Sequence, residues 1–382
     1  MKRSKRRRHG KWLKTGVILV LPTAMAIISA NTAPKTASES GSLRESETVS
    51  APHSSVTETV SKKSADDFLD GSVILSQGYG IKPEIEKGRN YLKLTPPMDM
   101  VSDNVGATPY PVEWGGGGEI IRTTFGEYIG DSFFNLDNGG QVNNKTEVPN
   151  DELLAESWFM PNFKVESTAE PLVLLYHTHT CESFEPYVRD EFDVNFNFRT
   201  TDPTKSVVMV GDAIQAELEA QGIGVIHETS IHDYPSYNGA YDRSRADIVP
   251  ILEKYPSIRV VLDIHRDALG NDGQAYQPFI RVDGKEAAQI MIISGCDDGT
   301  MGMPNHLENF HFACALQQKL EQDNPGFTRP ILFDYRCYNQ DLTNGSLLIE
   351  VGSHGNTLDQ VQYAGQLFGK SLGEFLRTMS EG

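Results

Sequence analysis

The residues best able to do chemistry follow a short apolar run near the middle of the chain. In the segment LVLLYHTHTCESFEP, five apolar residues lead directly into His177, His179 and Glu182. Alternation along an extended chain predicts that both histidines point to the same face, with Glu182 within a turn of them. Imidazole and carboxylate are zinc ligands, and a catalytic zinc keeps one position for water. The segment therefore predicts a zinc site, with a hydrogen-bonded pair of structural histidines as the alternative.

A second apolar run ends in polar residues in the segment RVVLDIHRDALG. His265 is the candidate for a distant third ligand, and Asp263 or Asp267 can accept from its other ring nitrogen and so fix the tautomer. Arg266 is a candidate to bind a substrate carboxylate, because a guanidinium pairs with carboxylates through two parallel hydrogen bonds. A structural ion pair is the alternative for Arg266.

The third motif, SLLIEVGSHGNT, places Glu350 at the end of another apolar run. In zinc hydrolases a glutamate that does not bind the metal takes a proton from the attacking water and passes it to the leaving amine. Glu350 is the candidate for this base, with a buried ion pair as the alternative. For Asn356, which stands where the last helix is predicted to begin, the role of helix N-cap is favoured over catalysis.

Other catalytic motifs are absent from the sequence. The chain contains no GxSxG, HExxH or GxxxxGK[ST] pattern, which disfavours a serine hydrolase of that type, a thermolysin-type protease and a P-loop enzyme. The four cysteines form no CxxC pair, so neither a zinc ribbon nor a thioredoxin site is indicated, and their pairing stays open. A thiol nucleophile at Cys181 is disfavoured, because no helix N-terminus is evident there to lower its pKa.

Short apolar runs alternate with helix-period segments from residue 171 onward, which is typical of an α/β layer fold. Ser206 begins a predicted helix in which Val207, Val210, Ile214 and Leu218 share one face. The active sites of open α/β sheets gather at the carboxyl ends of strands, where the three motifs lie. The predicted strands are 172–176, 223–226, 259–264, 289–293 and 347–351, and the predicted helices are 206–221, 243–254, a segment around 312–320 and 358–375.

The beginning of the chain has the order of an export segment. The chain has 382 residues and a net charge of −18, and residues 1–14 are basic without an acid. Residues 15–33 then form an apolar signal-anchor or signal peptide, and 34–68 form a Ser/Thr-rich flexible linker. Residues 69–160 are predicted as an N-terminal extension or small module, and 161–382 as the catalytic domain. Beyond the basic start the chain is strongly acidic, which disfavours nucleic-acid binding.

Five segments in this order resemble the stage II sporulation protein P family, over roughly residues 70–380. They are LLYHTHTCESFEPY, SVVMVGDAIQAELEAQGI, HDYPSYNGAYDRSR, LDIHRDA and YNQDLTNGSLLIEVGSHGNTLDQ. The resemblance implies a Zn²⁺-dependent peptidoglycan hydrolase that cuts the N-acetylmuramoyl-L-alanine amide, with an endopeptidase activity also attributed to the family. It implies thinning of septal peptidoglycan during forespore engulfment, in a complex with stage II sporulation proteins D and M. A stem-peptide endopeptidase, or a scaffold whose catalysis is secondary, is the alternative.

The resemblance also implies a fold similar to the zinc amidases, with a mixed, mostly parallel sheet flanked by helices. It implies zinc ligands at His177, Glu182 and His265, with His179 as the alternative ligand, and a catalytic Glu350. Arg266 and Asn356 are the predicted substrate-binding residues. The implied location is the extracytoplasmic face of the mother-cell membrane, with the protein held there by its N-terminal segment.

Overall fold

The computed structural model describes residues 107–380, apart from 166–169 and 272. The predicted basic segment 1–14, the apolar segment 15–33 and the linker 34–68 lie outside the described residues. Among the helices that are described, none has the length and apolar character needed to cross a membrane.

The larger sheet contains eight strands and carries the predicted motifs. Its central strands, β4, β7 and β13, are buried at nearly every position, so that they read as continuous apolar runs, as parallel strands covered on both faces do. Strands β6, β4, β7 and β13 run parallel to one another, while β11 runs antiparallel to β13. The strand order is β2 (Phe133–Asn135), β3 (Gln141–Asn144), β12 (Ile331–Asp334), β11 (Ile290–Gly295), β13 (Ser346–Ser353), β7 (Val260–Asp267), β4 (Pro171–Tyr176) and β6 (Gly224–His227).

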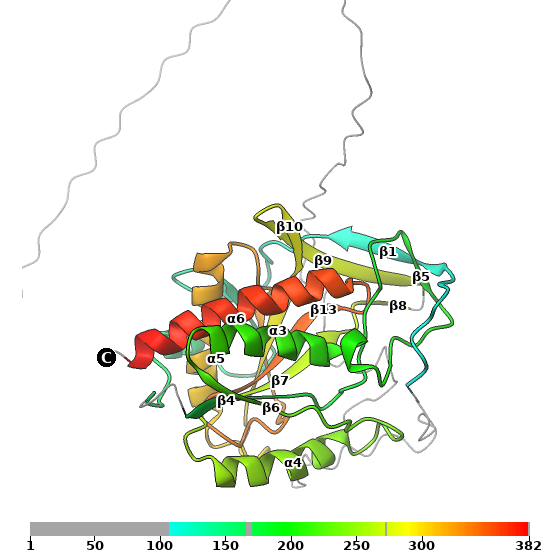
Figure 1. Cartoon of the computed structure of the whole chain (residues 1–382). Coiled ribbons are helices and arrows are strands. Elements are labelled where there is room, and N and C mark those ends of the chain that lie inside the picture. Colours follow the sequence, from blue (N-terminus) through cyan, green and yellow to red (C-terminus); the bar gives the residue numbers. More distant parts are fainter. Residues whose placement is uncertain (1–106, 166–169, 272, 381–382) are drawn as a thin grey trace, which may run out of the picture. The chain divides into compact units, whose positions relative to one another are not determined.

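Helices cover both faces of this sheet (Figure 1). Helices α3 (Val207–Ala220), α5 (His306–Asp323) and α6 (Leu358–Ser380) share the main apolar core with one face. Helix α4 (Ala240–Lys254) packs on the other face, through Ile248 against Leu174 and Val261. Strands β4, β6 and β7 lie between α4 and the α3–α6 pair. The mixed, mostly parallel sheet flanked by helices that the sequence predicts is therefore present.

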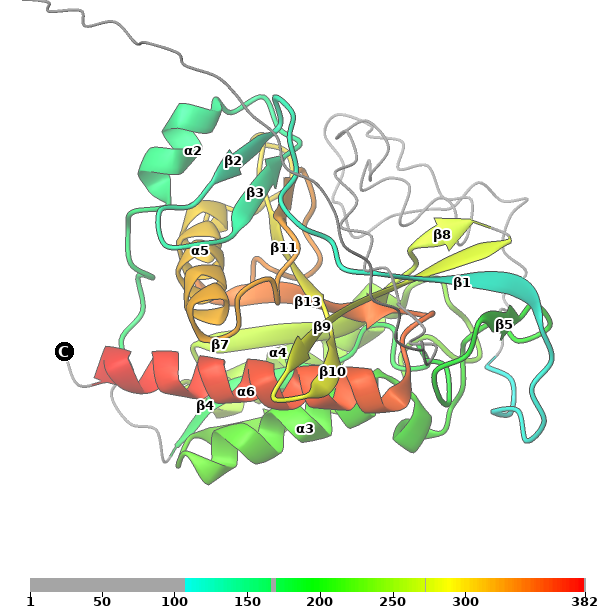
Figure 2. The same cartoon turned by 90° about the horizontal axis from the view of Figure 1, so that it is seen from above.

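A second sheet, which the sequence does not predict, lies beside the first (Figure 2). Its order is β10 (Lys285–Ala288), β9 (Gln274–Val282), β1 (Gly117–Thr123) and β5 (Glu191–Asp193), and β8 (Gly270–Asn271) also pairs with β9. Strand β1 runs parallel to β9 and antiparallel to β5. Helix α6 packs against β10, which joins the second sheet to the main core.

The described part of 69–160 is not a separate module. Strand β1 is paired inside the second sheet, and β3 is paired with β12 of the larger sheet. The short helix α2 (Asn150–Glu156) packs against α5. Because these strands obtain their hydrogen bonds from strands of 161–382, the described part of 69–160 fits the N-terminal extension of the two alternatives.

Candidate active site

A pocket lies on the α4 face of the larger sheet, at the strand ends that carry the three motifs. Side chains two residues apart along a strand share a face. Leu348 and Glu350 of β13 therefore point to the same side, as do Val261, Asp263 and His265 of β7. Parallel pairing sets Glu350 directly beside His265. The pocket is lined by His179, Glu182, Tyr237, Tyr241, His265, Arg266, Ala268, Ile293, Leu332, Arg336, Tyr338, Leu348 and Glu350.

His177 does not reach this pocket. Strand β4 ends at Tyr176 and the chain turns, so the alternation that would put His177 and His179 on one face does not continue. His177 is fully buried, with Nδ1 3.0 Å from the carbonyl oxygen of Ile264 and Nε2 2.8 Å from Nε2 of His227. Both of its ring nitrogens have other partners, so the structure does not bring His177 together with Glu182 and His265, and His177 as a metal ligand stays a prediction.

Of His177 and His179, it is His179, the alternative ligand, that lines the pocket. Its ring stacks on Tyr237 with the centroids 4.3 Å apart and stands edge-on to His265 at 5.3 Å. Its Nδ1 atom is buried without a hydrogen-bond partner and lies 3.8 Å from Oδ2 of Asp233. Burial, together with the charge of His265, holds the pKa of His179 well below its usual range. The imidazole is therefore neutral, as a metal ligand must be.

His265 and Glu182 face one another in the pocket. Nδ1 of His265 lies 3.6 Å from Oε2 of Glu182, and its Nε2 lies 2.8 Å from Oδ1 of Asp263. Asp263 is itself fixed, because it accepts hydrogen bonds from the backbone N–H and the hydroxyl of Thr178. Glu182 accepts the backbone N–H of Arg266 at 3.1 Å. Asp263, rather than Asp267, thus orients the His265 ring, while Asp267 accepts a hydrogen bond from Arg329 at 2.8 Å.

Glu350 completes the pocket as a buried carboxyl group. It is 5% exposed, and its Oε2 atom has no hydrogen-bond partner. Burial and the nearby Asp267 raise the pKa of Glu350 to about 8, against the lowering effect of His265. A carboxyl group with this pKa can both accept and release a proton near neutral pH, which a general acid–base group requires.

The pocket residues fit a bound Zn²⁺ ion. Burial raises the pKa of Glu182, and burial lowers that of His265 while Asp263 and Glu182 raise it to a net value of about 9. The rise for His265 comes from the carboxylates of Asp263, Glu182 and Glu350, which would also attract a cation. The 3.6 Å between His265 and Glu182 exceeds a hydrogen bond. It is near the roughly 3.4 Å that separates two tetrahedral ligands of one zinc.

The histidine and carboxylate groups of the pocket are more widely spaced than a finished metal site. Among the described residues, the three side chains with ligand atoms all within 4.8 Å of one another are Glu228, His232 and Asp247. These side chains do not line the pocket. An ion held by His179, Glu182 and His265 would therefore draw these three side chains together.

The two predicted substrate-binding residues have structural roles. The guanidinium of Arg266 donates to the backbone carbonyls of Ser183, Phe198 and Asp267, at 2.9, 3.1 and 3.2 Å. Although it lines the pocket, it holds the segment after His179 against β7. Because Nε, Nη1 and Nη2 each donate to a carbonyl, the geometry favours a structural role, and substrate binding by Arg266 stays a prediction.

Asn356 is fully buried outside the pocket. Its amide accepts the N–H of Ser353 and donates to the carbonyl of Pro278, both at 2.9 Å. The helix cap is the next residue, Thr357, which exchanges hydrogen bonds with Gln360 as a capping box. Asn356 therefore fixes the turn before α6 and does not meet a substrate in the pocket.

Three functional neighbours were missed in the sequence. Asp233 lies behind His179, and its Oδ1 accepts the backbone N–H of Cys181 at 3.1 Å while Arg199 contacts its Oδ2. Arg336 and Tyr338 form the opposite wall, with Arg336 donating to the Tyr338 hydroxyl at 2.6 Å. They lie in a turn after β12, where only the density of polar and aromatic residues in FDYRCYNQD could have marked them.

The four cysteines are free thiols. Cys181 is buried, and desolvation together with the nearby Asp233 raises its pKa far above the ordinary value. A thiol held in its neutral form is a poor nucleophile. This finding supports the sequence argument against a cysteine enzyme.

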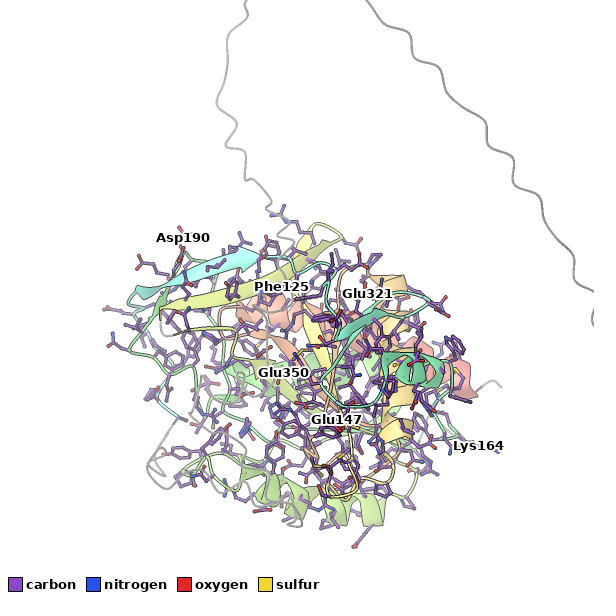
Figure 3. The ribbon with its side chains drawn as sticks, turned by 180° about the vertical axis from the view of Figure 1, so that it is seen from behind. Phe125, Glu147, Lys164, Asp190, Glu321 and Glu350 are labelled. Carbon is purple, nitrogen blue, oxygen red and sulfur yellow. The ribbon has the colours of Figure 1, made fainter. Side chains whose placement is uncertain are left out.

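Glu350 is the labelled pocket residue in Figure 3, in the central part of the ribbon. It comes from the segment that the sequence comparison covers: the family model of stage II sporulation protein P matches residues 130–373, which include all three motifs. The chain belongs to this family. Stage II sporulation protein P of Bacillus subtilis (strain 168) is 29% identical over 204 residues, which cover 50% of this chain and 48% of that protein. The chain thus spans about half the length of the curated relative that it matches.

Solved structures of amidases are also similar to this member of the stage II sporulation protein P family. N-acetylmuramoyl-L-alanine amidase AmiC2 of Nostoc punctiforme matches 55% of this chain and 98% of its own, at 12% identity and a TM-score of 0.32. The catalytic domain of CwlV, an N-acetylmuramoyl-L-alanine amidase from Bacillus (Paenibacillus) polymyxa var. colistinus, matches 54% of this chain and 98% of its own, at 13% identity and a TM-score of 0.32.

Proposed function

We propose that this protein is a Zn²⁺-dependent peptidoglycan hydrolase that cleaves the amide between N-acetylmuramic acid and L-alanine. We further propose that it thins septal peptidoglycan during engulfment of the forespore. Membership of a sporulation family supports the biological setting. One observation carries the chemistry: His179, Glu182 and His265 converge on one pocket, beside the buried Glu350.

His179, Glu182 and His265 would hold the ion in this proposal. Bound Zn²⁺ would polarise the scissile carbonyl and lower the pKa of water. Glu350 would accept a proton from the attacking water and return it to the leaving amine. Asp263 would hold the His265 ring in place, as carboxylates behind metal-bound histidines do.

The aromatic and basic side chains that line the pocket would receive the stem peptide. Tyr237 and Tyr241 offer flat apolar surfaces beside His179, with ring contacts at 4.3 and 5.6 Å. Arg336 replaces Arg266 as the candidate partner for a peptide carboxylate. Its Nε and Nη1 donate to Asp334 and Tyr338, and for Nη2 no partner is found among the described residues.

Residues 1–68 would determine where this chemistry takes place. In the proposal, the basic residues 1–14 stay in the cytoplasm, the apolar residues 15–33 anchor the chain in the mother-cell membrane, and 34–68 form the tether. The catalytic domain would then face peptidoglycan in the space between the two membranes. Stage II sporulation proteins D and M are the proposed partners. Nucleic acid is not a proposed partner.

Product analysis tests the proposal. Purified peptidoglycan is digested with the full chain and with Glu350→Gln, and the products are resolved by mass. Intact stem peptides together with free muramoyl residues are expected for an amidase. Shortened stems would indicate the alternative, a stem-peptide endopeptidase, and unchanged peptidoglycan in both digests would favour the scaffold alternative.

A further inference from the structure

A second cluster of metal-ligand side chains lies behind the wall of the pocket. Glu228 follows β6, His232 lies in the next loop, and Asp247 projects from α4. Nε2 of His232 lies 3.1 Å from Oδ2 of Asp247 and 3.4 Å from Oε2 of Glu228. The three ligand atoms all lie within 4.8 Å of one another. This spacing is tighter than that of the histidines and carboxylates in the pocket.

The hydrogen bonds of His232 determine which of its nitrogens can bind an ion. Nδ1 lies 2.8 Å from the carbonyl oxygen of His177, and a carbonyl can only accept, so Nδ1 carries a proton. In a neutral ring the lone pair of Nε2 would then point at two carboxylates, which is repulsive. Either a second proton or a metal ion must lie on Nε2. A backbone carbonyl on the other nitrogen is the usual support of a metal-bound histidine.

Glu228 favours the metal ion over the second proton. Its side chain is 10% exposed, and its Oε2 atom is buried without a hydrogen-bond partner. Its other oxygen accepts the backbone N–H of Ser230 at 2.7 Å, which aims Oε2 into the cluster. The guanidinium of Arg243 donates to the carbonyls of His232, Ser236 and Asn238, and no ion pair between Arg243 and Glu228 is found among the described residues. This oxygen lies 3.4 Å from Nε2 of His232, which is longer than an ordinary hydrogen bond, and a cation between the two atoms offsets the cost of burying the carboxylate.

We propose that Glu228, His232 and Asp247 bind a second divalent cation, of the Zn²⁺ class. One imidazole and two carboxylates are ligands that zinc accepts, and the half-exposed Asp247 leaves a side open to solvent for water. The ion would tie the loop after β6 to helix α4. His232 is followed by Asp233, which faces His179, and the same loop carries Tyr237, so the ion would hold one wall of the pocket in place.

Metal counting tests this inference independently of the proposed active site. The full chain is stripped with a chelator, equilibrated with Zn²⁺, freed of excess metal and measured by mass spectrometry of the elements. Roughly two zinc ions per chain are expected for the unsubstituted protein, and roughly one for Glu228→Gln/Asp247→Asn. Roughly one is also expected for Glu182→Gln/His265→Ala, which keeps the second site. Glu253→Gln, an exposed carboxylate of the same helix, is the control and should keep both ions.

The outcomes separate the two sites. If the chain binds one zinc that only Glu182→Gln/His265→Ala removes, the second site is overturned while the proposed active site stands. If it binds one zinc that only Glu228→Gln/Asp247→Asn removes, the second site stands and the zinc of the proposed function is overturned. Asp247→Asn alone guards against misfolding, because Asp247 is half-exposed; its zinc affinity at this site should fall at least about tenfold. An unchanged affinity would contradict the proposal.

Discussion

Nδ1 of His265 faces Oε2 of Glu182 across 3.6 Å, while its other nitrogen lies 2.8 Å from Asp263. The imidazole is thus held from behind by one carboxylate and directed at another. The distance to Glu182 exceeds a hydrogen bond and suits two ligands of one ion. His179 and Glu350 line the same pocket, so the relationship between His265 and Glu182 is the centre of the proposed zinc site.

Substitutions of His177 and His179 should have opposite effects on zinc content. We expect His179→Ala to lose the active-site zinc and His177→Asn to keep it. His177→Asn should instead lower the free energy of unfolding by about 1–3 kcal/mol, because it disrupts the buried contacts with Ile264 and His227. Zinc content and urea unfolding of both variants provide the measurement. Loss of zinc from His177→Asn, with retention in His179→Ala, would restore His177 as the ligand.

Asp263→Asn should weaken zinc binding, although Asp263 is not one of the proposed ligands. The carboxylate lies against Nε2 of His265 and is also fixed by Thr178, so the change loosens the ring that points to the metal. The zinc affinity is expected to fall about 10- to 100-fold, measured by competition with a coloured chelator. Asp242→Asn, an exposed carboxylate in the first turn of α4, is a control that should leave the affinity unchanged.

Substitutions of the two arginines that line the pocket should differ in effect: one should lower stability and the other should weaken substrate binding. Arg266→Ala removes hydrogen bonds to three backbone carbonyls and should lower the free energy of unfolding by about 3 kcal/mol. Arg336→Ala should raise KM for muramoyl-peptide substrates at least about tenfold with a smaller effect on kcat, because a carboxylate partner is lost. Equal effects of both variants on KM would show that the assignment of Arg336 is wrong.

Stability should depend on pH through His354. Burial, with a further effect of Arg266, lowers the pKa of His354 to about 3. Below pH 6.5 the unfolded chain therefore binds a proton that the native protein excludes, and stability falls as the pH falls. Between pH 7.5 and pH 5 this group should cost about 2 kcal/mol of unfolding free energy. Urea unfolding at both pH values should show a loss in His354→Leu that is about 2 kcal/mol smaller than in the unsubstituted protein, because the buried His179 contributes to the loss in both. Identical pH dependence of the two would contradict the assignment.

Most of the larger sheet and its helices could be predicted from the sequence, because each element buries an apolar pattern. The N-cap at Ser206 and the helix 206–221 correspond to α3, which begins at Val207. The second sheet was missed because β1 begins within a run of four glycines and β9 contains Pro278. Both strands obtain their order from pairing with each other, at a sequence separation that no local pattern records.

The residue types of the site could be predicted from the sequence better than the directions in which their side chains point. Glu182, His265 and Glu350 lie where strand ends place them, in one pocket. The direction of His177 depends instead on Ile264 and His227, which lie 87 and 50 residues away. Arg336 escaped prediction because it precedes a turn in which Tyr338 and Asn339 both have positive φ. No apolar period marks such a turn.

The most direct test of the account combines zinc content with peptidoglycan digestion for Glu350→Gln, Glu182→Gln and the unsubstituted full chain. Glu350→Gln should keep its zinc and lose at least about 10²-fold in the release of intact stem peptides, because the base is lost while the ligands remain. Glu182→Gln should lose one zinc together with activity. A Glu350→Gln protein that digests peptidoglycan as fast as the unsubstituted chain would contradict the proposed active site.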